Sequence, residues 1–133
     1  MSKANILVVD DREDFANRER LPWAAAVIAQ DFNAVLDSLT FDADDSVISA
    51  TRGHAFDATI IERTAGSGAG YVGMLGSKRK LAVIRRALEA AGVAGEHLDR
   101  VRCPIGQDIG ADTPAEIAVS VVAELIRVRR KGD

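Results

Sequence analysis

The stretch at residues 71–80, YVGMLGSKRK, decides the fold of this chain. It opens with apolar residues around Gly73, as a buried strand does, and it then turns through Gly76 and Ser77 into a basic segment. Ser77 favours a helix start, because its hydroxyl accepts a hydrogen bond from a free N–H group of the first turn. Apolar residues then recur at spacings of three and four, which predicts an amphipathic helix. They are Leu81, Ile84 and Leu88.

A strand that ends in a glycine turn and a capped helix is a favourable place for an anion. The free N–H groups and the helix dipole favour negative charge there, and cationic side chains add to them. We therefore expect a phosphate site, with both lysines on the surface, at Gly73, Gly76, Ser77, Lys78 and Lys80. The alternative is an ordinary strand-to-helix connection with surface lysines, because Gly-x-x-Gly is short and common.

The composition indicates a single domain over residues 1–133. The hydrophobic share of 47% can fill a core, and the net charge of −3 argues against a nucleic-acid partner. The single cysteine excludes an internal disulfide and is typical of a reducing compartment. Because neither a signal peptide nor a long apolar run is visible, we expect a cytoplasmic protein with no membrane partner.

An apolar run at Ile6 to Val9 predicts a central parallel strand that is buried on both faces. It ends in Asp10, Asp11 and Arg12, which would lie at the carboxyl edge of the sheet. Ligands of open α/β sheets bind at that edge, where an acid commonly accepts hydrogen bonds from ribose hydroxyls. The alternative is a solvated turn in which Arg12 pairs with Asp11 or Asp14.

The next predicted strand, Ser46 to Thr51, leads into a short helix over Ala55 to Arg63. His54 and Asp57 are three residues apart and are expected to share one face of that helix. Together with Thr51 they are candidate ligand contacts, and the alternative is a surface histidine near an acid. A zinc site is not expected, because zinc requires three or four ligands.

A second glycine loop, IGQDIGAD at residues 105–112, follows a short strand over Arg100 to Cys103. We interpret Cys103 as a buried strand thiol rather than a nucleophile, because the sequence supplies no base for it. The loop adds three candidate contacts, Gly106, Asp108 and Gly110.

A capping box at residues 113–116, with Pro114 in the first helical position, starts the last helix. This helix is expected to run to Arg130, and its start is a second candidate anion site. Its apolar face is formed by Ile117, Val121, Leu125 and Val128.

The alternation of strands and helices predicts an α/β fold, a Rossmann-like three-layer α/β/α arrangement with a mainly parallel sheet. Strands are expected near Ile6–Val9, Ala24–Ala29, Val47–Ala50, Tyr71–Leu75 and Val101–Cys103. Helices are expected near Asp31–Leu39, Ala55–Arg63, Lys78–Ala91 and Pro114–Arg130. The strand ends would then converge on one edge of the sheet and form a ligand site there.

Four ordered segments resemble the C-terminal Rossmann-type domain of the XdhC/CoxF family: ILVVDDREDFANRERLP, TRGHAFD, YVGMLGSKRK and CPIGQDIGADTPAEIAVSVVAELI. The resemblance implies a role in maturing molybdenum hydroxylases such as xanthine dehydrogenase and carbon monoxide dehydrogenase. Family members bind the molybdenum cofactor, which contains molybdopterin, help it to acquire its sulfido ligand through a cysteine desulfurase, and deliver it to the apoenzyme. They act as chaperones rather than as the hydroxylase itself.

The sequence departs from the family pattern at its start. The family domain opens with a strand and a Gly-Ala-Gly-His-Val turn, whereas only nine residues precede Asp10 here; a Rossmann acid follows its glycine loop by about 20 residues. We therefore expect a domain truncated at the N-terminal β-strand, with a gap between the strand that ends at Asp10 and the strand that starts at Tyr71. Self-association would fill this gap. The alternatives are closure within the monomer and a partner chain that supplies the missing strand.

Three functions follow from these residues. In the first, a maturation protein binds the molybdenum cofactor or a nucleotide, with phosphate at Gly73, Gly76, Ser77 and Lys78 and the pterin or ribose near Asp10 and His54. The second is an NAD(P)-binding oxidoreductase module, against which the absence of Gly-x-Gly-x-x-Gly counts. The third is an assembly protein that has no ligand of its own and requires a partner chain.

Overall fold

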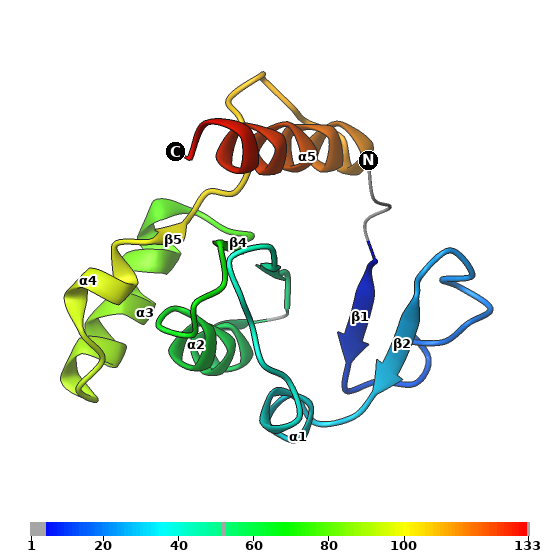
Figure 1. Cartoon of the computed structure of the whole chain (residues 1–133), viewed down its shortest axis with the longest axis horizontal. Coiled ribbons are helices and arrows are strands. Elements are labelled where there is room, and N and C mark those ends of the chain that lie inside the picture. Colours follow the sequence, from blue (N-terminus) through cyan, green and yellow to red (C-terminus); the bar gives the residue numbers. More distant parts are fainter. Residues whose placement is uncertain (1–4, 52, 133) are drawn as a thin grey trace. The chain divides into compact units, whose positions relative to one another are not determined.

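The computed structural model describes residues 5–51 and 53–132, without the side chains of residues 53 and 54. The chain divides into two compact units, Met1–Thr40 and Phe41–Asp133, and each is described by itself. The first unit holds β1 (Leu7–Asp10), β2 (Ala26–Ala29) and α1 (Phe32–Asp37) (Figure 1). The second holds β3 (Ser46–Ser49), α2 (Gly53–Thr64), β4 (Tyr71–Met74), α3 (Lys78–Ala90), α4 (Gly95–Leu98), β5 (Val101–Arg102) and α5 (Pro114–Lys131).

In the first unit, β1 and β2 pair in parallel, with Leu7 opposite Ala26 and Asp10 opposite Ala29. Asp31 caps α1, because its carboxylate accepts a hydrogen bond of 3.2 Å from Ala34 N. The expectation that β1 is buried on both faces is wrong. No residue of β1 is buried, because among the described strands it has one hydrogen-bonded neighbour, β2.

In the second unit, β4 is the centre of a parallel sheet with the order β3–β4–β5. Val72 lies opposite Val47 on one side and opposite Val101 on the other, and every residue of β4 is buried. The expectation that the Tyr71 strand would border a gap is therefore wrong. Among the described strands, β3 and β5 form the two edges of this sheet, because each pairs only with β4.

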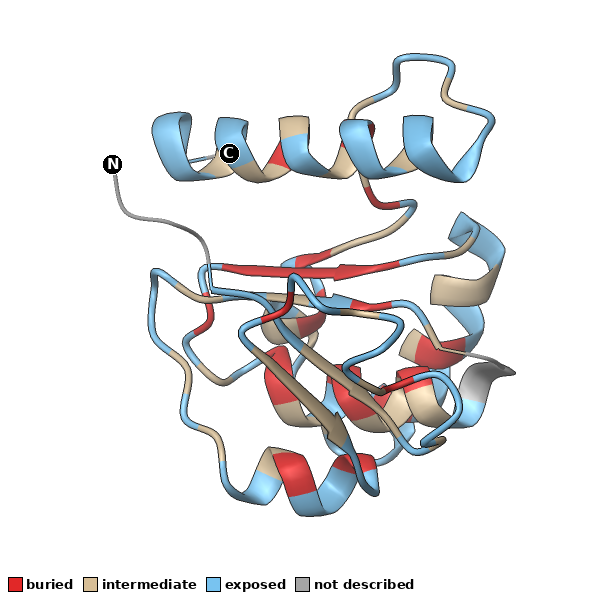
Figure 2. Cartoon of the chain, turned by 90° about the vertical axis from the view of Figure 1, so that its right-hand side faces the viewer, coloured by how far each residue is buried: buried red, intermediate tan, exposed pale blue. Residues whose placement is uncertain are grey.

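The hydrophobic core of the second unit lies where α2 and α3 cover one side of this sheet (Figure 2). It is formed by Ile61, Ala65, Ala69, Val72, Met74, Ile84, Leu88, Leu98 and Val101. The predicted stripe of α3 is confirmed, because Ile84 and Leu88 are buried there and Leu81 packs against them. The predicted α/β architecture with parallel strands is therefore confirmed.

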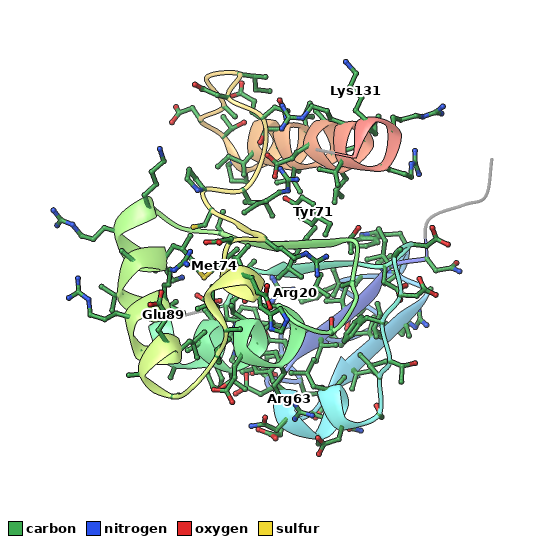
Figure 3. The ribbon with its side chains drawn as sticks, turned by 60° about the vertical axis from the view of Figure 1, so that its left-hand side comes forward. Arg20, Arg63, Tyr71, Met74, Glu89 and Lys131 are labelled. Atoms are coloured by element: carbon green, nitrogen blue, oxygen red, sulfur yellow. The ribbon has the colours of Figure 1, made fainter. Side chains whose placement is uncertain are left out.

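Helix α5 lies on the other side of this sheet and is attached by polar contacts (Figure 2). Its buried residues are Ser120 and Glu124. Tyr71 of β4, which lies between the sheet and α5 in Figure 3, donates a hydrogen bond of 2.6 Å to Glu124. Gln107 N donates one of 2.9 Å to the carbonyl oxygen of Ser120. The predicted capping box is confirmed, because the Thr113 side chain and the Glu116 side chain each accept from the other's backbone N–H.

Candidate functional site

The carboxyl end of β3 is fastened to α2 by a buried carboxylate, Asp57. Its side chain is fully buried, and its Oδ1 atom accepts hydrogen bonds of 2.6 Å from Ser49 Oγ and 2.7 Å from Thr51 Oγ1. The backbone N–H of Thr51 points to the same oxygen at 3.4 Å. Asp57 therefore holds the backbone of the β3–α2 connection as well as its side chains.

Lys80 of α3 supplies the charge that balances Asp57. Its Nζ atom pairs with Oδ2 of Asp57, an oxygen that no other polar group among the described residues contacts. The same ammonium donates a hydrogen bond of 3.3 Å to the carbonyl oxygen of Leu75. The expected surface position of Lys80 is therefore wrong: its side chain is 17% exposed and points into the protein.

Gly76 makes room for this inward lysine. Its φ angle is +148°, and a Cβ atom at this position would lie 2.7 Å from Cδ of Lys80. The turn that carries the chain from β4 into α3 thus combines a backbone that favours glycine with a close approach of the lysine stem. Gly76 therefore permits the Lys80–Asp57 contact.

The protonation of Asp57 reflects two opposing effects. Burial on its own would raise the pKa of the carboxyl group, because it disfavours the charged form. The Lys80 ammonium and the hydroxyl groups of Ser49 and Thr51 outweigh burial, and the pKa lies below its usual value. Asp57 is therefore ionised at neutral pH.

The first turn of α3 faces solvent above this pair. Ser77 is the predicted N-cap and accepts a hydrogen bond of 3.1 Å from Lys80 N. Ser77, Lys78 and Arg79 are exposed, and the N–H groups of Lys78 and Arg79 have no acceptor among the described residues. Two N–H groups and two cationic side chains are therefore available to an anion.

Cys103 lies at the same edge, directly after β5. Its thiol donates to the carbonyl oxygens of Gly76 at 3.3 Å and of Ser77 at 3.4 Å. Burial raises the pKa of this thiol, and the Lys80 ammonium only partly opposes that effect. Cys103 is thus a half-buried, neutral thiol beneath the start of α3, whereas the sequence predicted a buried thiol within the strand.

Two glycines of the predicted phosphate and loop sites have packing roles on the α5 side of the sheet. A Cβ atom at Gly73, which is buried inside β4, would lie 2.7 Å from Cε1 of Tyr71. Gly106 has a φ angle of +99°, and a Cβ atom there would overlap Oγ of Ser120. Its N–H also donates a hydrogen bond of 3.3 Å to Glu124. Both glycines therefore make room for the contacts that attach α5.

Two of the other candidate residues lie apart from the Asp57 cluster. Asp108 and Gly110 are exposed in the loop before α5, and no contact joins them to Asp57 or Lys80 within the described part of the chain. His54 belongs to the first turn of α2, but its side chain is outside the described residues.

The acidic end of β1 forms a separate group in the first unit. Arg12 donates to both carboxylate oxygens of Asp10, from Nε to Oδ1 at 3.0 Å and from Nη2 to Oδ2 at 3.0 Å. Its guanidinium also stacks on Phe15, 3.8 Å from the ring centre. The alternative interpretation named Asp11 or Asp14 as the partner of Arg12, whereas the ion pair in the structure joins Arg12 to Asp10. This pairing lowers the pKa of Asp10 to about 2.

Four residues of the two internal networks were not among the candidates from the sequence. Ser49 and Cys103 join the Asp57 cluster, and Tyr71 and Glu124 form the link to α5. A signal existed for the first pair, because the residues at the carboxyl ends of neighbouring parallel strands meet at one edge. Glu124 stood among the apolar residues of an amphipathic helix, and its partner lies 53 positions earlier in the chain.

Within the described ranges, no group of three or more His, Cys, Asp and Glu side chains is arranged to hold a metal ion. Among the same residues, no helix combines the length and the apolar character that crossing a membrane requires.

Comparison with known proteins connects this fold with a family. The family model described as the XdhC Rossmann domain matches residues 1–125. The chain is 34% identical over 126 residues to YqeB of Escherichia coli (strain K12), a protein named as uncharacterized. It is 32% identical over 128 residues to a protein of Bacillus subtilis (strain 168) that is named as a probable xanthine dehydrogenase subunit. The crystal structure of a xanthine dehydrogenase from Bacillus halodurans matches it with a TM-score of 0.77 at 30% identity.

These matches cover nearly all of the chain and a smaller part of each relative. They span 94% of the chain and 23% of the Escherichia coli protein, and 96% of the chain and 36% of the Bacillus subtilis protein. The structural match covers 96% of the chain and 36% of the Bacillus halodurans chain. The predicted Rossmann-like fold is confirmed, and the chain belongs to the XdhC family, whose Rossmann domain it matches.

Proposed function

We propose that this chain is an accessory protein in the maturation of a molybdenum hydroxylase of the xanthine dehydrogenase type. The observation that carries the proposal is the family match over residues 1–125. The Bacillus subtilis relative, whose name refers to xanthine dehydrogenase, supports the same client class. In this role the chain binds the molybdenum cofactor and presents it to the apoenzyme. A cysteine desulfurase is the second partner, because it provides sulfur for the cofactor.

The start of α3 is the part of the chain that fits a phosphate-bearing ligand. The N–H groups of Lys78 and Arg79, the hydroxyl of Ser77 and the ammonium of Lys78 all face solvent there. Lys80 is already the counter-ion of Asp57, so in this proposal it positions the turn and leaves the phosphate to Lys78. The cofactor supplies the metal chemistry of the client enzyme, and this chain holds the cofactor by its phosphate.

We assign no catalytic residue to the chain. The Cys103 thiol is neutral because burial raises its pKa, and its hydrogen bonds to two carbonyl oxygens favour the protonated form. Asp57 and Lys80 neutralise each other inside the protein. These unreactive groups support the function of a carrier that binds, orients and protects a reactive cofactor better than the function of an oxidoreductase.

The test is whether the purified chain retains the cofactor when it is isolated from cells that make molybdopterin. Oxidation converts the bound pterin to a fluorescent form that reports the amount retained. We expect Lys78→Glu to lose most of it, because it places negative charge at the anion site. Arg86→Glu is the matched control, since Arg86 is an exposed cation further along α3.

Three outcomes would contradict this proposal. If the wild-type chain retains no pterin but binds NAD(H) or NADP(H), it is a dinucleotide-binding module. If it binds neither ligand, it is an assembly protein without a ligand of its own. Equal retention by Lys78→Glu and Arg86→Glu would place the cofactor away from the start of α3.

A further inference from the structure

The outer face of α5 carries an apolar stripe that the fold leaves uncovered. Val119, Val122 and Ile126 form this stripe and are 61%, 54% and 47% exposed. Their spacings of three and four put them on one side of the helix. The buried residues Ser120 and Glu124 lie on the opposite side of the helix, which is the side that attaches α5 to the protein. We propose that two copies of this chain associate through these stripes, with their α5 helices packed antiparallel.

The charges along α5 fit a second copy in the antiparallel direction. Asp112 and Glu116 stand at the start of the helix, and Arg129, Arg130 and Lys131 stand at its end. None of these three cations pairs with a carboxylate among the residues that the structure describes. A parallel pair would bring the two basic ends together. An antiparallel pair places each basic end beside the acidic start of the other copy and aligns the helix dipoles favourably.

A two-fold axis near Val122 covers the apolar stripe of each copy and also pairs the opposite charges at the two ends of the helices. With the axis between Val122 and Ala123, Val119 faces Ile126, Glu116 faces Arg129, and the Val122 side chains of the two copies adjoin each other across the axis. Such a contact closes after two copies, because the same patch is used on both sides. Its apolar centre and charged ends follow the usual arrangement of a specific interface.

The first test measures the mass of the chain by sedimentation equilibrium, from low micromolar to millimolar concentration. The wild-type chain is expected to form dimers. Val122→Arg should raise the dissociation constant of the dimer by roughly 30-fold or more, as the loss of a central anchor does. Val83→Arg on α3 is the matched control, since Val83 is a valine with an exposure of 49% outside the stripe. Circular dichroism verifies that both variants are folded.

The second test reports the geometry of the contact. Val122→Cys in a Cys103→Ser background places a single thiol near the two-fold axis, so mild oxidation should link two copies rapidly. Val83→Cys in the same background should link far more slowly. The double variant Arg129→Glu, Arg130→Glu should weaken the dimer, and added salt should weaken the wild-type dimer but not that variant.

Three results would overturn the proposal. A wild-type chain that is monomeric at millimolar concentration would show that the stripe does not bind a second copy and is free to bind a different polypeptide. A Val122→Arg dimer as tight as the wild-type dimer would assign the association to another surface, such as the unpaired edge of β3. Equal linking rates for Val122→Cys and Val83→Cys would exclude the antiparallel α5 contact.

Discussion

Lys80 and Asp57 form an ion pair in which the carboxylate is fully buried and the lysine side chain is 17% exposed. The lysine comes from the basic run at the start of α3, and the carboxylate comes from α2. The pair therefore joins two helices beneath the turn where we expect phosphate to bind. Lys80, which the sequence predicted to contact a ligand, therefore holds the turn in place from inside the protein.

Lys80→Met should destabilise the second unit strongly. The methionine keeps much of the apolar stem, but Asp57 loses the cation that balances it while it remains buried. Removal of one member of a buried pair costs ~3–5 kcal/mol, and we expect the lower end because Lys80 is partly exposed. Urea unfolding measures the loss. Lys78→Met is the control, since an exposed residue should change stability by less than ~0.5 kcal/mol; equal effects of the two variants would contradict an internal role for Lys80.

Tyr71→Phe should loosen the attachment of α5. The variant removes the hydroxyl that donates to Glu124, and among the described groups the buried carboxylate then keeps the N–H of Gly106. We expect a loss of ~1–3 kcal/mol, the usual cost of an unsatisfied buried group. Glu89→Gln, which affects an exposed pair with Arg85, should cost at most ~1 kcal/mol. A Tyr71→Phe protein that unfolds at the wild-type urea concentration would show that this hydrogen bond contributes nothing.

Acid should weaken the first unit through Asp10. Arg12 lowers the pKa of Asp10 from 3.8 to about 2 in the folded protein, so the unfolded chain takes up the proton first. The stabilisation from this pair is complete above pH 3.8 and is lost as the pH falls from there to about 2. Trp23, the one tryptophan of the chain, provides the fluorescence signal for unfolding.

The control for this pH dependence is a pair of asparagine variants. Asp10→Asn removes the carboxyl group and should flatten the dependence of stability on pH over that interval. Asp44→Asn changes an exposed acid of the second unit and should leave it as in the wild-type chain. Identical pH profiles for Asp10→Asn and the wild-type chain would contradict the Arg12–Asp10 pairing.

Gly73→Ala should destabilise the sheet at its centre. A Cβ atom at this position would lie 2.7 Å from Cε1 and 2.8 Å from the hydroxyl oxygen of Tyr71, and 2.9 Å from Cδ1 of Ile105. Overpacking of this kind typically costs ~1–3 kcal/mol. Gly95→Ala in α4 is the control, because the nearest atom lies at 3.5 Å and alanine favours a helix. Thermal unfolding compares the two variants, and a Gly73→Ala protein as stable as Gly95→Ala would show that Tyr71 moves aside without cost.

Local features of this chain could be predicted because short-range chemistry determines them. Asp31, Ser77 and Thr113 each cap a helix through an N–H group a few residues away, so the pattern is visible in the sequence itself. The strand positions follow in the same way from runs of apolar residues.

Features that depend on distant partners could not be predicted in this way. Lys80 and Lys78 look equivalent in the sequence, and only the position of Asp57 distinguishes the inward lysine from the outward one. The burial of β1 was overestimated because an apolar run indicates a strand without indicating how many neighbours that strand has. Asp10 and Arg12 are two residues apart, but several acids compete for the same guanidinium in the sequence.

The attachment of α5 has a consequence for the motions of the second unit. Among the described residues, none of the hydrophobic core cluster comes from α5, and the buried residues of the helix are polar. Water can replace those hydrogen bonds when the helix separates, and its release leaves that core cluster covered while it exposes Tyr71 and Ile105 on the other side of the sheet. We therefore expect α5 to open as a local unfolding unit while the β3–β4–β5 sheet stays folded, and its amide hydrogens to exchange with solvent long before those of β4.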